Sequence, residues 1–175
     1  ISGQTNAMAH PMYPYDTAEE LAMPYLKLVL DEDIYYSDEN GGFITNINSS
    51  LNSVNVKLEG LWCTVYTNGS IPSSLLTLQN GYNLLDVAGN LKEASAYRSV
   101  NLIHDHMNLW LPGFTGLDFA LTTNIDVEGD CNAFFDGVSI NFFDTGGGCN
   151  PTSLIADVVH HEYGHGINSY FYNSL

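Results

Sequence analysis

Two histidines close to the end of the chain place the strongest constraint on its fold. The stretch VVHHEYGHGIN, residues 158–168, holds His161 and His165 four positions apart, with Glu162 directly after the first. On an α-helix, residues i and i+4 lie one above the other, so a helix brings both imidazoles to a common point. His160 lies one position round the helix and is excluded from the pair. The stretch therefore predicts a helix with two convergent imidazoles.

The residues around the pair also favour a helix, but not a purely structural one. Residues 151–153, Pro-Thr-Ser, supply helix-start chemistry, and an apolar run begins at Leu154. Gly164 and Gly166 each weaken a helix by ~1 kcal/mol relative to alanine. A metal or a closely packed neighbour would explain both glycines.

Two imidazoles and a carboxylate in this arrangement suit zinc-dependent hydrolysis. His161 and His165 can share one zinc ion, while Glu162 reaches a water on that metal without ligating it. Zinc lowers the pKa of the water and polarises the scissile carbonyl, and the glutamate can pass the proton to a leaving amine. The motif predicts zinc as cofactor, the two histidines as its ligands and Glu162 as the catalytic acid and base.

The sequence supplies only two of the ligands that such an ion needs. Zinc sites use three or more protein ligands, and the ten residues after His165 contain no acid. The helix is also apolar nearly all round, from Leu154 to Tyr172, which indicates neighbours on both sides. We therefore expect this chain to be the N-terminal portion of an enzyme, inactive alone, with the third ligand in a helical lobe downstream.

Residues 1–90 are predicted to be rich in β-structure. Four segments between glycine-containing turns alternate or carry β-branched residues, which predicts an antiparallel meander. They are residues 25–36, 41–47, 53–60 and 61–67. The first fifteen residues show no periodicity and predict a surface arm. Residues 17–20, Thr-Ala-Glu-Glu, match a helix capping box, but Pro24 follows too soon for a long helix.

Residues 91–175 show a different pattern. Apolar residues at helical spacing predict a helix over residues 92–109, which Pro112 stops. His104 and His106 are two positions apart, so they face different sides of that helix and cannot chelate one ion together. We expect both to pack against the core or to face solvent.

A strand over residues 117–127 and a hairpin over residues 131–144 are predicted next, the hairpin turning at an Asp-Gly pair. Cys131 and Cys149 bracket this hairpin and could form a disulfide, although their spacing does not fix the pairing. Cys63 lies in an apolar stretch and is predicted to be a buried thiol.

The acidic composition excludes two classes of partner. Twenty Asp and Glu residues against four Lys and Arg give a net charge of −16, and such a surface repels nucleic acid and anionic membranes. It is compatible with cation binding, with basic substrates or with solubility in salt. No apolar run is long enough to span a bilayer, and no signal peptide opens the chain. We expect a secreted protein from which a signal and any propeptide have been removed.

Several acidic residues could bind calcium. The clusters at residues 31–33 and 38–39 lack a twelve-residue calcium loop, so solvated turns are the simpler interpretation. Asp157 lies one turn before His161 and could orient a zinc ligand or bind calcium. An acid that favours the helix dipole accounts for Asp157 equally well.

The second half of the sequence resembles a known enzyme family. The blocks CNAFFDG and DVVHHEYGHGI, separated by a glycine-rich loop, resemble the active-site region of the thermolysin-like and fungalysin-like gluzincin metallopeptidases. AYRSVNLIHDHM, residues 96–107, resembles the preceding helix, and the similarity covers residues 92–172. The longer metzincin motif is not matched, because it needs Gly and His where this chain has Asn168 and Phe171.

The resemblance implies roles for further residues. Asn132 and Ala133 match edge-strand positions that hydrogen-bond an extended substrate backbone, and Phe134 matches the aromatic position beside them. Without the resemblance, aromatic residues at period two would be read as ordinary core. Asp157 matches a calcium-binding aspartate, and the third zinc ligand would be a glutamate on a later helix.

The implied fold is an α+β, zincin-like N-terminal lobe. Residues 1–90 would be its β-rich N-terminal region, and residues 91–175 the first half of the catalytic domain. A secreted zinc endopeptidase that acts on proteins or peptides is the leading hypothesis. One alternative is a non-catalytic zincin-like module for binding or adhesion, which would not take up zinc. The other is an acidic β-domain stabilised by calcium and not by zinc.

Overall fold

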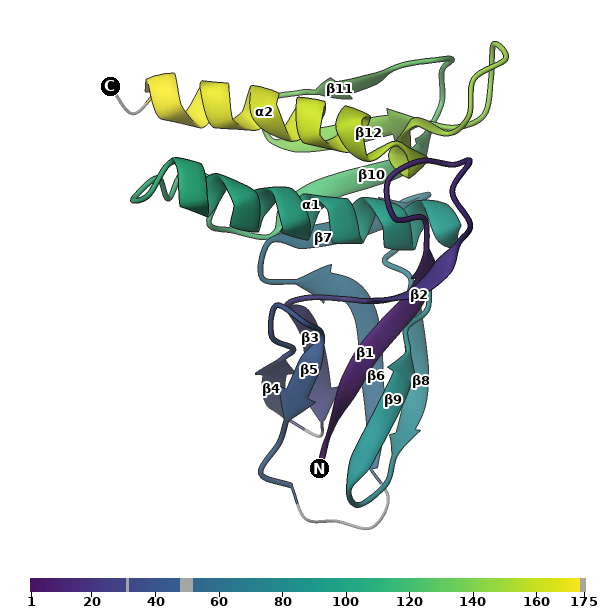
Figure 1. Cartoon of the computed structure of the whole chain (residues 1–175), viewed down its shortest axis with the longest axis vertical. Coiled ribbons are helices and arrows are strands. Elements are labelled where there is room, and N and C mark those ends of the chain that lie inside the picture. The colour runs from purple at the N-terminus through teal and green to yellow at the C-terminus, as the bar shows by residue number, and fades with distance from the viewer. Residues whose placement is uncertain (31, 48–51, 174–175) are drawn as a thin grey trace.

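The protein has a mixed α+β structure. The computed structural model describes residues 1–30, 32–47 and 52–173. Figure 1 shows helices α1 (Leu91–Trp110) and α2 (Ala156–Asn173) side by side at one end, with most strands of the first half extending away from them. The α+β class expected from the sequence is confirmed at this level.

The other elements are strands and one short 3-10 turn that leads into α2. In chain order they are β1 (Ser2–Ala9), β2 (Glu19–Ala22), β3 (Leu26–Leu30), β4 (Asp33–Tyr36), β5 (Gly42–Ile44), β6 (Asn52–Gly60), β7 (Cys63–Thr67), β8 (Ser73–Leu78), β9 (Tyr82–Asp86), β10 (Leu121–Val127), β11 (Ala133–Phe135), β12 (Ser139–Phe143) and η1 (Thr152–Leu154). The hairpin predicted over residues 131–144 is formed by β11 and β12.

One sheet contains strands from both halves of the chain. Its order is β11-β12-β10-β7-β6-β3-β4, and β8 also pairs with β6. Strands β3, β4, β6, β7 and β8 pair antiparallel, but β10 lies parallel to both β7 and β12. The antiparallel meander expected over residues 25–67 is correct for β3, β4, β6 and β7, but not for β5, which pairs with β1 in a second sheet. Parallel neighbours need a long crossover, and the connection from β7 to β10 includes α1.

The N-terminal residues form a strand, so the expected surface arm is wrong. Strand β1 is central in a second sheet, where β2 and β5 pair antiparallel with it and β9 pairs parallel. The inward residues of β1 are buried and small, namely Gly3, Thr5, Ala7 and Ala9. Small inward residues give a weak alternation signal, which explains why the sequence pattern did not reveal the strand.

The last two residues of the segment that matched a capping box begin strand β2. Glu20 of β2 lies opposite Met8 of β1, and Asn6 Nδ2 donates to Glu20 Oε1 at 3.1 Å. Pro24 follows too closely for a helix to form. The carboxylate expected to cap a helix instead pairs across two strands.

Helix α1 confirms the helix predicted over residues 92–109. The Asn90 side chain accepts hydrogen bonds from the first turn, and the Glu93 carboxylate accepts one from the Asn90 N–H at 2.7 Å. Tyr97 is fully buried, and its hydroxyl donates to the Pro24 carbonyl at 3.0 Å. These contacts fix α1 between the strands and α2.

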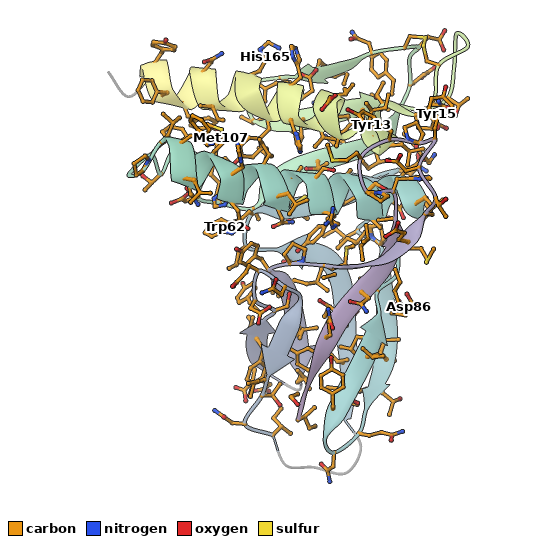
Figure 2. All side chains as sticks on the ribbon, in the orientation of Figure 1. Tyr13, Tyr15, Trp62, Asp86, Met107 and His165 are labelled. Carbon is orange, nitrogen blue, oxygen red and sulfur yellow. A yellow bond between two sulfur atoms is a disulfide. The ribbon has the colours of Figure 1, made fainter. Side chains whose placement is uncertain are left out.

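His104 packs where α1 meets the strands. Its ring stacks on Trp62 with centroids 4.1 Å apart, and its Nε2 lies 3.1 Å from Asp118 Oδ1. His104 is buried, whereas His106 is exposed. Both positions agree with the sequence prediction, and Figure 2 shows Trp62 between α1 and the strands beneath it.

Cys131 and Cys149 form a disulfide, with their Cα atoms 5.4 Å apart. The structure thus decides the pairing that their spacing left open. Cys63 is a free, buried cysteine as predicted. Burial raises the pKa of its thiol to about 12, so the thiol stays protonated and packs as a small apolar group.

Candidate metal centre

Helix α2 begins close to the predicted helix start and is anchored at that end. The chain turns through η1, and the Ala156 N–H then donates to the Met12 carbonyl at 2.9 Å. Val159 and Tyr163 are buried in the core. Because they fix one side of the helix, His161 and His165 are exposed on another.

His161 and His165 converge on one face of α2. Their Nε2 atoms lie 3.1 Å apart, and their rings are nearly perpendicular, at 88°. Two nitrogens bound to one zinc ion at 2.0–2.1 Å in tetrahedral geometry would lie about 3.3 Å apart. Figure 2 shows His165 on the side of α2 turned away from α1. The arrangement fits two ligands of a zinc ion.

Glu162 lines the same cleft as the histidine pair but is shielded from solvent. It is only 5% exposed, although both histidines are exposed. A carboxylate in this position can take a proton from a water in the cleft while the protein covers most of its surface. The position suits a general base.

Strand β11 forms the opposite wall of the cleft. It pairs with β12 and ends the sheet. The Phe143 N–H donates to the Asn132 carbonyl at 3.3 Å, and hydrogen-bonded pairs alternate in an antiparallel ladder. The backbone groups of Ala133 and Phe135 therefore point away from β12. No other strand in the described part of the chain pairs with that edge.

The helix and the strand edge enclose an open cleft of about 560 Å³. It is lined by Asn132, Ala133, Phe134, Phe135, Gly137, His161, Glu162, His165 and Ser169. The structure thus brings together the six residues predicted for metal binding, catalysis and substrate contact. Ser169 was not predicted, although it follows His165 by four positions and helical spacing could have found it. Gly137, in the hairpin turn, was also missed as a lining residue.

The residues predicted to contact the substrate differ in which of their groups are accessible in the cleft. The Asn132 carbonyl accepts from the Phe143 N–H and from the Thr152 hydroxyl, which lies 3.0 Å away. Its backbone therefore turns into the hairpin, while its side chain is exposed in the cleft. Phe134 is 38% exposed and packs edge-on against Phe143, with centroids 5.8 Å apart. It combines ordinary packing with an accessible apolar surface.

The two helix glycines have different surroundings. A Cβ at Gly166 would lie 3.4 Å from Leu117 Cδ1 and 3.6 Å from Phe135 Cε2. At Gly164, a Cβ would meet no atom within 4 Å among the described residues. A Cβ at Gly166 would make only ordinary van der Waals contacts, so a closely packed neighbour explains neither glycine.

Asp157 contacts the N-terminal segment of the chain. Its Oδ2 accepts from the Tyr13 hydroxyl at 2.9 Å, and this hydrogen bond raises the pKa of Tyr13. Figure 2 shows Tyr13 beside the start of α2, where an acid also favours the helix dipole. The structure thus gives Asp157 two roles that need no metal.

The described residues do not complete a metal site. Within residues 1–30, 32–47 and 52–173, no three His, Cys, Asp or Glu side chains gather to hold one ion. Asp38 accepts from the Asn40 and Gly42 N–H groups at 2.9 and 2.8 Å, as expected of a solvated turn. Asp31 of the other acidic cluster lies outside the described residues. The histidine pair therefore has no third protein ligand within these ranges.

Comparison with known proteins gives no family for this chain. No protein-family model matches the sequence, and no curated protein matches it. In the part of the chain that the structure describes, neither helix has the length and apolar character needed to cross a membrane. The functional evidence is therefore the geometry of the cleft.

Proposed function

We propose that this chain carries the zinc-binding half of the active site of a secreted endopeptidase of the gluzincin type. The observation that supports this most is the approach of the His161 and His165 Nε2 atoms to 3.1 Å. Glu162 lies with them in a cleft whose opposite wall is an unpaired strand edge. Zinc, when bound, polarises the scissile carbonyl and acidifies the attacking water.

The side chains on α2 divide the chemistry between them. His161 and His165 would hold the ion through Nε2. Glu162 takes a proton from the attacking water and delivers it to the leaving nitrogen. One water is thereby added across the C–N bond, giving a carboxylate and an amine without a covalent enzyme intermediate.

The substrate is proposed to be a protein or peptide segment in extended conformation. It adds to the edge of β11 as a further strand, bonded to the N–H and C=O groups of Ala133 and Phe135. Phe134 offers an apolar contact at the rim, and Asn132 contributes its exposed side chain. The strand pairing sets the direction of the peptide and places one carbonyl beside Glu162 and the histidine pair.

The third zinc ligand is proposed to come from a further helical lobe of the same polypeptide. Large apolar side chains at the ends of α1 and α2 support a contact surface there, since Leu109 is 80%, Trp110 72% and Tyr172 69% exposed. Exposed apolar patches commonly mark such surfaces. A carboxylate from this lobe would complete a three-ligand site with an open position for water.

The disulfide between Cys131 and Cys149 supports the proposed extracellular location. Disulfides form and persist in oxidising compartments and are rare in the cytosol. The net charge of −16 further disfavours nucleic acid and anionic membranes as partners.

The test is zinc analysis and casein cleavage with the natural polypeptide that contains this sequence. Replacing Glu162→Gln is expected to leave zinc bound and to lower kcat by about 10²- to 10⁴-fold, the range typical of losing a general base. Glu128→Gln, an exposed acid outside the cleft lining, is the matched control.

Three other outcomes would argue against the proposed function or favour a different one. Unchanged cleavage by the Glu162→Gln variant contradicts a hydrolase at this site. Peptide binding without zinc uptake favours a zincin-like binding or adhesion module. A melting temperature raised by calcium but not by zinc favours a calcium-stabilised β-domain.

A further inference from the structure

We propose that Thr152 and the Cys131–Cys149 disulfide are positioning groups that fix the substrate edge relative to the metal-binding helix. This inference rests on the proposed function of the cleft. It adds the residues that keep the two walls of the cleft in register, none of which lies on α2 or within β11 itself. We call these two contacts the hairpin tie.

Thr152 bonds both strands of the hairpin at its base. It lies in η1, directly before α2, and is 6% exposed. Its Oγ1 lies 3.0 Å from the Asn132 carbonyl oxygen and 3.2 Å from the Phe143 carbonyl oxygen. A threonine hydroxyl has one proton to donate, which these two carbonyls share. A single buried side chain therefore connects the start of β11 and the end of β12 to the segment that leads into α2.

The disulfide joins the same two segments. Cys131 directly precedes Asn132, and Cys149 lies three positions before Thr152. The covalent bond and the hydrogen bond therefore act side by side on the base of the hairpin. Together they limit how far the hairpin can slide or tilt against the start of α2.

Helix α2 is held by contacts that do not include the hairpin tie. The Ala156 N–H donates to the Met12 carbonyl, and Val159 and Tyr163 are buried in the core. The histidine pair is therefore expected to keep its geometry when the hairpin tie is removed.

Strand β11 pairs with β12 along its length and faces α2 across the cleft. Beyond its base, the ring of Phe135 approaches Gly166, where a Cβ would lie 3.6 Å from Phe135 Cε2. The backbone N–H and C=O of Ala133, which are proposed to bind the substrate, lie between that contact and the hairpin tie. Removing the hairpin tie would therefore let Ala133 shift relative to the metal ligands.

A shift of this kind has a defined kinetic effect. A misplacement of about 1 Å between reacting groups can lower a rate by about 10²-fold. We expect kcat/KM for peptide cleavage to fall by about 10- to 100-fold when the hairpin tie is removed, while zinc affinity stays within about twofold of wild type.

The experiment compares two variants that remove the hairpin tie with two controls, all in the natural polypeptide that contains this sequence. The first combines Cys131→Ser with Cys149→Ser, and the second is Thr152→Val, which removes the hydroxyl at nearly constant volume. Thr152→Ser keeps the hydroxyl and is expected to retain wild-type kcat/KM. Thr77→Val, at an exposed position on β8, is the control for threonine replacement away from the cleft.

Amide hydrogen exchange provides a readout that does not need activity. The Phe143 N–H donates to the Asn132 carbonyl. It is expected to exchange at least tenfold faster in the double cysteine variant and in Thr152→Val than in wild type. The Val159 N–H, which donates to the Ile155 carbonyl at 3.1 Å within the α2 region, is expected to exchange as in wild type.

These readouts separate the two proposals. A wild-type protein that neither binds zinc nor cleaves peptides contradicts the proposed function, while the exchange rates still test the hairpin tie. Folded variants with wild-type exchange at Phe143 and wild-type kcat/KM overturn the hairpin tie. Equal loss of protection at Phe143 and Val159 also overturns it, because that result shows a general structural role.

Discussion

The two walls of the cleft are held in place in different ways. Helix α2 packs into the core through Val159 and Tyr163, which are 0% and 2% exposed. Strand β11 has three residues, ends its sheet and carries Phe134 at 38% exposure. The proposed chemical groups therefore lie on a wall fixed by burial, and the proposed substrate-binding groups lie on a wall held by one neighbouring strand and by the hairpin tie at its base. A rigid element suits groups that must share one ion within tenths of an ångström.

The largest expected effect is a difference in unfolding free energy between variants of the two walls. Tyr163→Ala removes a buried aromatic side chain from the helical wall and should lower the free energy of unfolding by about 3–5 kcal/mol. Phe134→Ala, on the strand wall, loses mainly one edge-on aromatic contact and should lower it by about 1 kcal/mol. Urea unfolding of both variants measures the contrast. Similar losses for the two variants would show that the walls are equally supported.

A smaller effect is expected when the pH is lowered, which should destabilise the β11–β12 hairpin but not α2. Burial raises the pKa of Asp136, but hydrogen bonds from the Val138 N–H and from the Ser139 hydroxyl and N–H outweigh it, so the net pKa is lowered. A carboxyl group with a lowered folded pKa stabilises the fold above its unfolded pKa of about 3.9. That contribution is lost as the pH falls through the folded pKa.

The hairpin turn should therefore loosen below about pH 4, while α2 keeps its protection. Amide exchange of the Ser139 N–H as a function of pH measures this, after correction for the intrinsic pH dependence of exchange. The Asp136→Asn variant should show no such acid-dependent step. A step of equal size in that variant would assign the loosening to another group.

Elements with strong local signals were predicted well from the sequence. Helix α1 has apolar residues at helical spacing and its stop at Pro112, and the β11–β12 hairpin has its Asp-Gly turn. The histidine spacing placed His161 and His165 on one face because helical geometry is local. For the same reason, Glu162 was placed correctly beside them in the cleft.

Features that depend on distant contacts were missed. Strand β1 was taken for a surface arm because its inward residues are small, and its parallel pairing with β9 joins segments about eighty residues apart. Thr152 was read only as part of a helix start. Its link to the hairpin exists only because the chain folds Asn132 back beside η1.

The most direct test of the central claim is to locate zinc in crystals of the natural polypeptide by anomalous scattering at the zinc edge. We predict one ion about 2.0–2.1 Å from both His161 Nε2 and His165 Nε2, with a third ligand from outside the described residues. A fully zinc-loaded crystal with no ion between these two nitrogens would contradict the account.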